Sequence, residues 1–174
     1  MLYNFKVMTT ATVSFKKVEE FKEVAERIFL EQKRRIHELL PFAEVIHVGS
    51  TAIPGSLTKG DVDLLVRVSE DDFEKAKEKL KQLYQINQAE NWKNYFASFK
   101  DDLGGIDFGA QLVVKNSSLD DFVQLRDLLI GNPQLLHEYN QLKLKFEGKE
   151  MDEYRKEKSD FFEKLRVILR SKEE

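Results

Sequence analysis

Apolar positions recur along most of the chain at spacings that predict a mixture of helices and strands. Over residues 15–40 they recur mainly every three, four or eight positions with charged residues between them, which predicts an amphipathic helix ended by Pro41. The stretches 71–84 and 151–169 show the same kind of helical spacing. Each predicted helix therefore has one face suited to packing against another element.

Short apolar runs rich in β-branched residues separate the first helical stretches and predict strands. These runs are 44–48, 62–68, 95–99 and 106–115. The segment 101–105 ends in two consecutive glycines, which tolerate positive φ and indicate a hairpin between the last two runs. The sequence therefore predicts a small sheet that contains at least one hairpin.

From about residue 118 onward the pattern is helical, with a break at Gly131-Asn-Pro133. Ser118 or Asp120 is placed to cap the first of these helices, and Pro133 suits the first turn of the next. The element order predicts an α/β (α+β) fold, a small mixed β-sheet flanked by helices with a helical C-terminal third. We expect the last helices to cover the sheet or to form one wall of a cleft.

The domain boundaries follow from this order of elements. We expect one domain over residues 1–174, with a core at about 15–115 and a helical tail at about 118–170. Residues 1–13 are thinly patterned and suit either a short strand or an arm. The same stretch has no apolar run of signal-peptide length, and no run of about 18 apolar residues occurs in the chain. We therefore expect a cytoplasmic protein without a membrane partner.

Composition narrows the chemistry that the chain can perform. With 41% hydrophobic and 34% charged residues, the 174-residue chain is typical of a globular protein. The net charge of −3 provides no strong basic field, so a nucleic-acid partner is disfavoured. The chain has no cysteine, which removes disulfides, thiolate nucleophiles and Cys-based zinc sites. Candidate chemistry must therefore come from carboxylates, hydroxyls and cationic side chains.

Two carboxylates at the start of an apolar run form the main candidate site. Asp61 and Asp63 are two residues apart, so along a strand their side chains point to the same face. Adjacent like charges repel and lose hydration when buried, and a divalent cation relieves both costs. Mg²⁺ commonly takes one or two carboxylates and completes its shell with phosphate oxygens. The pair therefore predicts a catalytic Mg²⁺ site.

The loop before this pair has the features of a phosphate-binding segment. Gly49 allows a phosphate to approach the backbone, and Ser50 and Thr51 offer hydroxyls and N–H groups to its oxygens. Lys59 lies just before the pair and is a candidate contact for a triphosphate. Solvation of this lysine and a simple tight turn at the glycine are the alternatives.

Asp107 is the candidate third carboxylate. It lies near the start of the 106–115 run, and it faces the same metal if that run lies beside 62–68. Three carboxylates around one or two Mg²⁺ ions match a two-metal site for phosphoryl or nucleotidyl transfer. We assign Asp107 a catalytic and metal-binding role with Asp61 and Asp63, including help in deprotonating the acceptor.

Several other polar or aromatic residues have structural interpretations that compete with functional ones. His47 suits a structural hydrogen bond that fixes the loop, and Arg126 suits either a phosphate ligand or a surface salt bridge. Trp92, Tyr95 and Phe96 can stack a base but are more typical of a core. The remaining candidates, for which the sequence indicates a solvated helix face or no partner, are the charged run 147–158, His137 and Tyr139.

The stretch 47–68, HVGSTAIPGSLTKGDVDLLVRV, resembles the signature of the GrpB family. The stretches LRDLLIGNPQLLHEYNQLKLKF at 125–146 and YRKEKSDFFEKL at 154–165 resemble the helical tail of that family. By resemblance the family belongs to the nucleotidyltransferase superfamily, whose hallmark is Gly-Ser, a loop and then Asp-x-Asp. The resemblance implies a nucleotidyltransferase-like sheet-and-helix fold, with Mg²⁺ as cofactor and a nucleoside triphosphate as substrate. It supplies no established activity.

The sequence departs from the family pattern at two places. Many members have an apolar residue where this chain has Asp61, so the chain is closer to a working transferase site. The family's His-Leu-His strand corresponds here to 110–113, where Gln111 is the nearest polar residue. Any role of those histidines is therefore lost or moved.

Three functions remain open at this point. The first is Mg²⁺-dependent transfer of a nucleotidyl group from a nucleoside triphosphate to a small acceptor that bears a hydroxyl or an amine. The second is a non-catalytic module with the inherited fold that binds nucleotide or phosphate or interacts with proteins. The third is metal-assisted phosphate-ester hydrolysis by the same carboxylates. Neither the acceptor nor the oligomeric state follows from the sequence.

Overall fold

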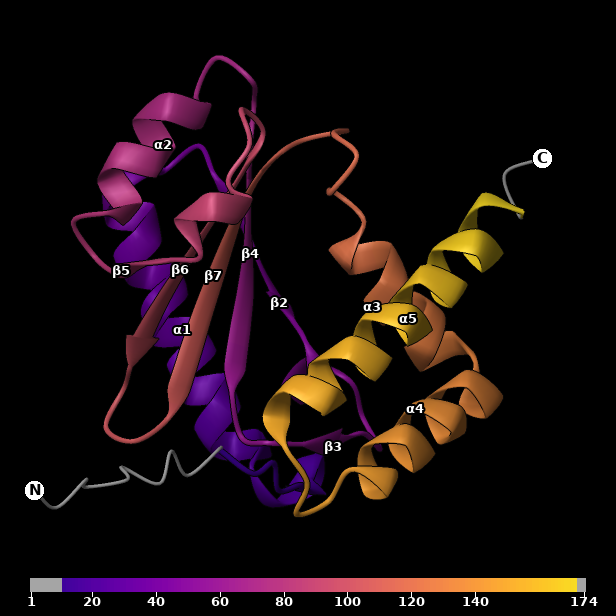
Figure 1. Ribbon diagram of the computed structural model, residues 1–174. Helices are drawn as coiled ribbons and strands as arrows, with labels where there is room; N and C mark the ends of the chain where they lie inside the picture. Colours follow the sequence, from indigo (N-terminus) through magenta and orange to yellow (C-terminus); the bar gives the residue numbers. More distant parts are fainter. Residues whose placement is uncertain (1–10, 172–174) are drawn as a thin grey trace, which may run out of the picture.

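A five-stranded sheet lies at the centre of the molecule, between two sets of helices (Figure 1). The structure is a computed structural model and describes residues 11–171. The strands of this sheet are β2 (Glu44–Val48), β4 (Val62–Val68), β5 (Gln85–Asn87), β6 (Phe96–Asp102) and β7 (Asp107–Val114). Their order is β2-β4-β7-β6-β5, in which β4 and β7 run parallel and the other neighbouring pairs are antiparallel.

Four of the five strands correspond to predicted runs, whereas β5 was not predicted. Strands β2 and β4 have the predicted bounds. The 62–68 and 106–115 runs were expected to lie side by side, and the pairing of Val62 with Phe108 confirms this. Strand β6 continues past the predicted end because its ladder with β7 extends to the Asp102–Asp107 pair. The hairpin turn then contains Gly104 and Gly105, both at positive φ, as the double glycine predicts.

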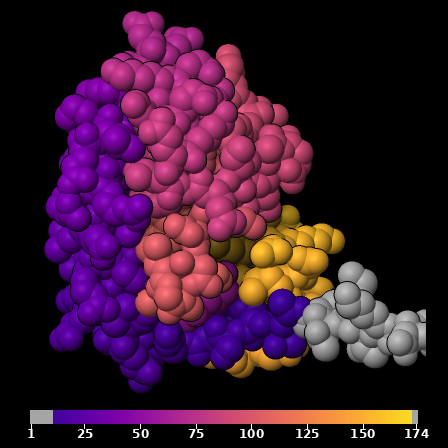
Figure 2. All heavy atoms as spheres, turned by 90° about the vertical axis from the view of Figure 1, so that its left-hand side faces the viewer, coloured from indigo at the N-terminus to yellow at the C-terminus, as the bar shows by residue number. Residues whose placement is uncertain are grey.

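One face of the sheet is covered by α1 (Lys22–Leu39) and α2 (Phe73–Leu80), as Figure 1 shows, and these two helices face the viewer in Figure 2. Strand β4 alternates, and its even-numbered residues from Val62 to Val68 join the main hydrophobic core with both helices. The largest core side chains include Phe73, Phe99 and Ile36. Burial of these even-numbered side chains fixes the register of β4. Its odd-numbered side chains, including Asp63, therefore lie on the opposite face of the sheet.

The first helix begins seven residues later than the 15–40 pattern predicts. Residues Lys16–Lys17 form β1, which pairs with β3 (Leu57–Thr58), and η1 (Val18–Glu20) is a short 3₁₀ helix. The Val18 backbone N–H donates to the Ser56 carbonyl, so the segment ahead of α1 is held to the loop that follows β2. These backbone bonds to a distant segment replace those that a longer helix would have made.

Three helices make up the C-terminal third, on the other side of the sheet from α1 (Figure 1). They are α3 (Phe122–Gly131), α4 (Pro133–Lys145) and α5 (Met151–Arg170). The expected break and the place of Pro133 are confirmed, and the Asn132 side chain accepts a hydrogen bond from the Leu135 N–H as N-cap. The helices share a second core with Leu129, Tyr139, Phe161 and Leu165. The predicted helical tail is therefore confirmed.

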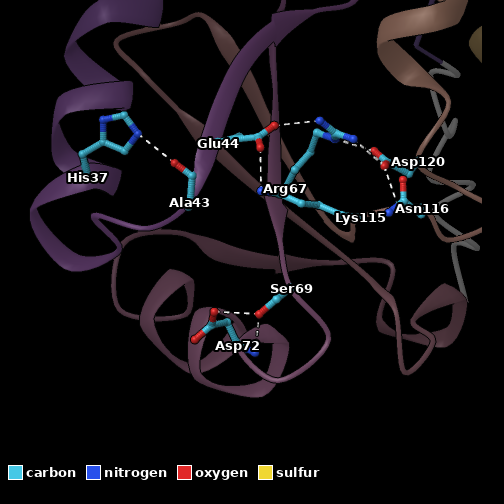
Figure 3. Close-up of polar contacts among 9 residues, drawn as sticks. All are labelled: His37, Ala43, Glu44, Arg67, Ser69, Asp72, Lys115, Asn116 and Asp120. Carbon is cyan, nitrogen blue, oxygen red and sulfur yellow. Dashed lines mark hydrogen bonds and ion pairs between the residues drawn. The ribbon is translucent and has the colours of Figure 1, made fainter.

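The predicted cap of α3 is wrong, because Asp120 is used elsewhere. The N-cap of α3 is Asp121, without a side-chain capping bond. Asp120 instead accepts two hydrogen bonds of 2.7 Å from Arg67 and one of 2.8 Å from the Asn116 N–H (Figure 3). Arg67 also contacts Glu44 of β2. This network joins the sheet to the start of the C-terminal helices.

Two expectations concern the remaining parts of the chain. Most of the predicted strand or arm at 1–13 lies outside the described residues, and at its end Thr12 forms an isolated bridge with Glu150. Within 11–171, no helix combines the length and the apolar character that crossing a bilayer requires.

Candidate functional site

Asp63 lies between two glycines on the sheet face that is turned away from α1. In the sheet, Asp63 pairs with Val48 on one side and with Gly109 on the other. A Cβ atom at Gly49 would lie 2.6 Å from one Asp63 carboxylate oxygen, and a Cβ at Gly109 would lie 2.6 Å from the other. Both flanking positions must therefore lack a side chain for the carboxylate to lie where it does.

Asp61 and Asp63 form the adjacent pair that the spacing predicts. Burial and the negative charge of Asp61 raise the pKa of Asp63 to about 6. Burial also acts to raise the pKa of Asp61, but the positive charges of Lys59 and Lys158 outweigh it, so this pKa lies below its usual value. The two carboxylates therefore repel each other, and together they attract cations.

Lys59 contacts one of these carboxylates directly. Its Nζ lies 3.1 Å from Asp61 Oδ2, and about a quarter of each side chain is exposed. The structure thus places this predicted triphosphate contact next to the acidic pair. Its ammonium provides part of the positive charge that the pair requires.

The segment after β2 turns tightly into a 3₁₀ helix, η2 (Ser50–Ala52). Gly49 allows this turn because it adopts a φ of 75°, a region that side chains disfavour. The buried Thr51 is hydrogen-bonded through Oγ1 to His47 Nε2 at 2.9 Å. Thr51 therefore helps to hold the loop, and Ser50 is the hydroxyl of this segment that lines the cavity described below.

His47 has the structural role that the sequence favours. Its ring stacks on Phe29 of α1, on the opposite face of the sheet from Asp63. Burial and the charge of Arg126 lower its pKa to about 4. Arg126 in turn donates to the His47 carbonyl at 2.8 Å and pairs with Asp127. Both residues therefore fix the end of β2.

Lys143, a fully buried lysine of α4, is a site residue that was not predicted from the sequence. Its Nζ donates to Ser50 Oγ at 2.8 Å, to Ser56 Oγ at 2.9 Å and to the Leu57 carbonyl. It also lies 3.7 Å from the centre of the Tyr139 ring. One lysine therefore ties both ends of the candidate phosphate loop to the C-terminal helices.

A sequence signal for Lys143 did exist. Leu135, Tyr139 and Lys143 follow one another at intervals of four and form the buried face of α4. A lysine that continues an apolar helix face has to be satisfied inside the protein. Tyr139, for which the sequence suggested no partner, stacks on Phe161 with ring centres 5.1 Å apart.

Lys143→Met is expected to destabilise the protein by about 1–3 kcal/mol, because buried oxygens lose their donor. Burial, with the charge of Lys158, holds the pKa of Lys143 well below its usual range. The unfolded chain then binds more protons, so this lysine adds stability as pH rises toward its unfolded pKa. The deficit of the variant in urea unfolding should therefore be larger at pH 10 than at pH 7.

Lys145→Met is the matched control for this measurement, since Lys145 lies on the same helix and is 62% exposed. Its unfolding free energy should match that of the wild type at both pH values. An equal deficit of Lys143→Met at pH 7 and pH 10 would show that Lys143 is an ordinary charged lysine.

A cavity of about 600 Å³ opens between this sheet face and the C-terminal helices. It is lined by Gly49, Ser50 and Asp63 at one end and by Asn87, Gln88 and Asn91 at another. The run 147–158, interpreted from sequence as a solvated face, contributes Arg155 and Lys158 to the wall. The interpretation holds for Arg155, whose side chain is 64% exposed, but Lys158 is partly buried because one face of α5 turns toward the sheet.

The aromatic candidates divide between core and cavity. Phe96 lines the cavity, whereas Trp92 packs against the main core, 5.4 Å from the Phe99 ring. Asp107 is exposed at the first residue of β7. Among residues 11–171, no three Asp, Glu, His or Cys side chains are grouped so that they could hold one metal ion. The described chain therefore brings Asp61 and Asp63 together without Asp107, whose catalytic role stays a prediction.

Sequence comparison decides the family of this chain. A profile of the family described as GrpB protein matches residues 17–167. The chain belongs to the GrpB family. A UPF0157 protein of Vibrio cholerae serotype O1 is 32% identical over 153 residues, which cover 88% of this chain and 81% of that protein.

Solved structures confirm the predicted fold class. The crystal structure of the conserved protein GrpB from Enterococcus faecalis is similar with a TM-score of 0.73 at 16% identity, and the match covers 92% of this chain and 99% of that one. This chain thus has the fold of that GrpB protein, a mixed sheet flanked by helices. A MgATP-bound structure of the Cid1 poly(U) polymerase aligns with a TM-score of 0.49 at 18% identity, over 75% of this chain and 42% of that chain.

Proposed function

We propose that this GrpB protein is a Mg²⁺-dependent nucleotidyltransferase that transfers NMP from a nucleoside triphosphate to a small acceptor and releases pyrophosphate. One observation carries the proposal. Asp63 lines the same cavity as Ser50 and Lys158, and the Asp61 carboxylate lies close enough to Asp63 to raise its pKa. Such an arrangement suits a ligand that carries both a cation and phosphates.

The donor set fits Mg²⁺. Asp63 is held between two glycines, and its raised pKa reports the cost of burying two like charges together. A divalent ion removes this cost, and Mg²⁺ needs only one or two carboxylates when phosphate oxygens complete its shell. When bound, it supplies charge neutralisation at the phosphate oxygens and at the leaving group. Asp107 is therefore not required to hold the first ion, and it remains the proposed third carboxylate.

The chain's own residues account for the binding of the triphosphate. Ser50 and the N–H groups after Gly49 face the phosphates, with Lys143 orienting the Ser50 hydroxyl from behind. Lys59 and Lys158 provide positive charge beside the pair. In the transfer, the acceptor oxygen bonds to the α-phosphorus, and the bond from this phosphorus to the pyrophosphate oxygen breaks. The acceptor proton passes to solvent, and pyrophosphate leaves with the bonding electrons.

A thermal-shift titration tests the binding step. ATP, GTP, CTP and UTP are added to the full chain with and without Mg²⁺, and the same series is run on Asp61→Asn/Asp63→Asn. Ligand at a hundredfold excess over Kd should stabilise the native state by about 2.7 kcal/mol. We expect a Mg²⁺-dependent rise in Tm for the wild type and none for the double variant. If no nucleotide shifts the wild type, the proposal is wrong.

A non-catalytic nucleotide-binding module is the second candidate, favoured by the absence of a three-acid group among the described residues. The two functions differ in the products that they release. Pyrophosphate release from a Mg²⁺–nucleotide mixture supports transfer, and inorganic phosphate alone would indicate hydrolysis. Binding without either product supports the module.

A further inference from the structure

The cavity extends from Asp63 to the β5–β6 edge of the sheet, the edge opposite β2 (Figure 1). At that end it is lined by Phe96 of β6 and by three amide residues at and just after the end of β5, which are Asn87, Gln88 and Asn91. None of these four residues carries a charge. The arginines of the lining belong to the helical wall, and each is paired with a carboxylate. The Asp63 end, in contrast, combines carboxylate and ammonium groups, so the two ends suit different parts of a ligand.

The strand register gives the separation of the two ends. Gly109 of β7 pairs with Asp63 of β4 on one side and with Lys100 of β6 on the other. Phe96 therefore lies two strands and four residues away from Asp63, roughly 15 Å at the spacings of a sheet. An acceptor that attacks the α-phosphorus has to lie near the metal, so the far end is too distant to hold it. The far end is placed instead for the part of the nucleotide that is remote from the phosphates.

Phe96 is half-buried and can be reached from the cavity. On its buried side it packs against the cluster that contains Leu65 and Val113. Phe99 of the same strand differs, because it lies in the core beneath α1 and α2 with no exposed surface. An aromatic ring that a sheet holds in place is a stacking platform for bases, because it loses little freedom when a ligand binds.

Gln88 and Asn91 are exposed, and their side chains bond to each other. Asn91 Nδ2 donates to Gln88 Oε1 at 3.3 Å. Within residues 11–171, the Gln88 Nε2 donor and the Asn91 Oδ1 acceptor have no further hydrogen-bond partner in the protein. A donor and an acceptor side by side match the polar edge of a nucleobase.

Backbone contacts hold these amides against the sheet. The Asn87 carbonyl accepts a hydrogen bond of 3.0 Å from Trp92 Nε1 and one of 2.8 Å from Ser98 Oγ. Gln88, the next residue, has a φ of 44°, a left-handed conformation that is uncommon outside glycine. Such conformations persist where the surroundings enforce them, and they cluster at ligand sites. The two free amide groups are therefore presented by a rigid segment.

We propose that the β5–β6 end of the cavity is a nucleobase site, in which a purine or pyrimidine stacks on Phe96 and bonds through its polar edge to Gln88 and Asn91. This assignment rests on the proposed function, in which the phosphates of the same nucleotide lie at the Asp63 end. It adds the residues by which the protein distinguishes a nucleotide from other phosphate esters.

The test compares AMP, CMP, GMP and UMP with D-ribose 5-phosphate, which carries no base, on the full chain in chelator. Calorimetry measures the affinities. Emission of Trp92 reports binding at this end, because it is the single tryptophan of the chain and its indole N–H bonds to the Asn87 carbonyl. We expect at least one monophosphate to change this emission and to bind about tenfold more tightly than D-ribose 5-phosphate, as one stacked base provides.

Two variants assign this gain to the proposed residues. Phe96→Leu keeps an apolar side chain without a ring, so it should weaken that monophosphate about tenfold and leave D-ribose 5-phosphate unchanged. Gln88→Gly removes the amide but suits the left-handed backbone, so it should weaken the monophosphate without lowering the Tm. Phe42→Leu is the matched control, since Phe42 is 37% exposed and contacts Lys75 of α2, away from the cavity. It should bind every ligand as the wild type does.

The base site is disproved if no monophosphate binds more tightly than D-ribose 5-phosphate, or if Phe96→Leu binds the monophosphates as the wild type does. In that case Mg²⁺–nucleoside triphosphate can still stabilise both proteins, and the proposed function stands. Failure of the proposed function has a different signature. The monophosphates then bind in a manner that depends on Phe96, while Mg²⁺–nucleoside triphosphate neither stabilises the protein nor yields pyrophosphate.

Discussion

Gly109→Ala is expected to abolish the Mg²⁺-dependent stabilisation by nucleotide and to lower transferase activity by roughly a hundredfold or more. The added Cβ would lie 2.6 Å from Asp63 Oδ1 and 3.1 Å from Gln111 Nε2, so the carboxylate must move. Gly109 has an ordinary φ, so the substitution strains no backbone and acts through this overlap alone. Overpacking of this kind also costs about 1–3 kcal/mol of stability. Thermal shift and pyrophosphate release measure the two effects.

Gly131→Ala is the matched control for this substitution. Gly131 also has an ordinary φ, and a Cβ there would meet nothing within 4 Å. Its replacement should keep the full nucleotide response and the wild-type stability or slightly more. A Gly109→Ala protein that responds to Mg²⁺–nucleotide like the wild type would show that the position of Asp63 does not matter to binding.

Asp63→Asn should make the metal-free protein more stable at neutral pH while removing its response to Mg²⁺–nucleotide. Burial and Asp61 raise the pKa of Asp63 to about 6, so between about pH 4 and pH 6 the folded state binds more protons than the unfolded state. Stability falls across that window as pH rises. At about 1.4 kcal/mol per pKa unit, the loss amounts to a few kcal/mol at neutral pH. The uncharged amide removes this loss.

Urea unfolding of wild type and Asp63→Asn from pH 4 to pH 8, in chelator, measures this effect. The two free energies should converge near pH 4 and separate progressively up to about pH 6. Excess Mg²⁺ and nucleotide should then reverse the order at pH 7, because only the wild type gains ligand binding. A variant that is less stable than the metal-free wild type at pH 7 contradicts the charge repulsion inferred for the pair.

The fold and the acidic pair followed from local sequence patterns. Strand β4 has the predicted bounds because its apolar run has strand length and because Asp61 and Asp63 lie at its start, on one face by the period of two. Asn132 and Pro133 likewise act through backbone geometry, which short-range spacing reports. Such features need no knowledge of distant contacts, so the sequence predicts them well.

The residues that the C-terminal helices contribute to the site were not predicted, because their roles depend on contacts between distant segments. Lys143 reaches Ser50 across 93 positions of sequence. Arg155 and Lys158 belong to a helix whose charges look like those of any solvated face until its orientation is known. The predicted cap at Asp120 failed for the same reason, because Arg67, 53 positions away, competes for that carboxylate. Spacing within a segment carries no information about such partners.

Because the Ser50 loop is anchored by Lys143, the parts of the site form in a fixed order during synthesis. Both carboxylates and the strands that flank them leave the ribosome well before α4 does, since β7 ends at Val114 and α4 begins at Pro133. The growing chain therefore holds its acidic pair while the loop that should receive the phosphates still lacks its anchor. Under the proposed function, the chain would become able to hold a triphosphate only when its last third has emerged and docked, and a prematurely released chain would keep the acids without the site.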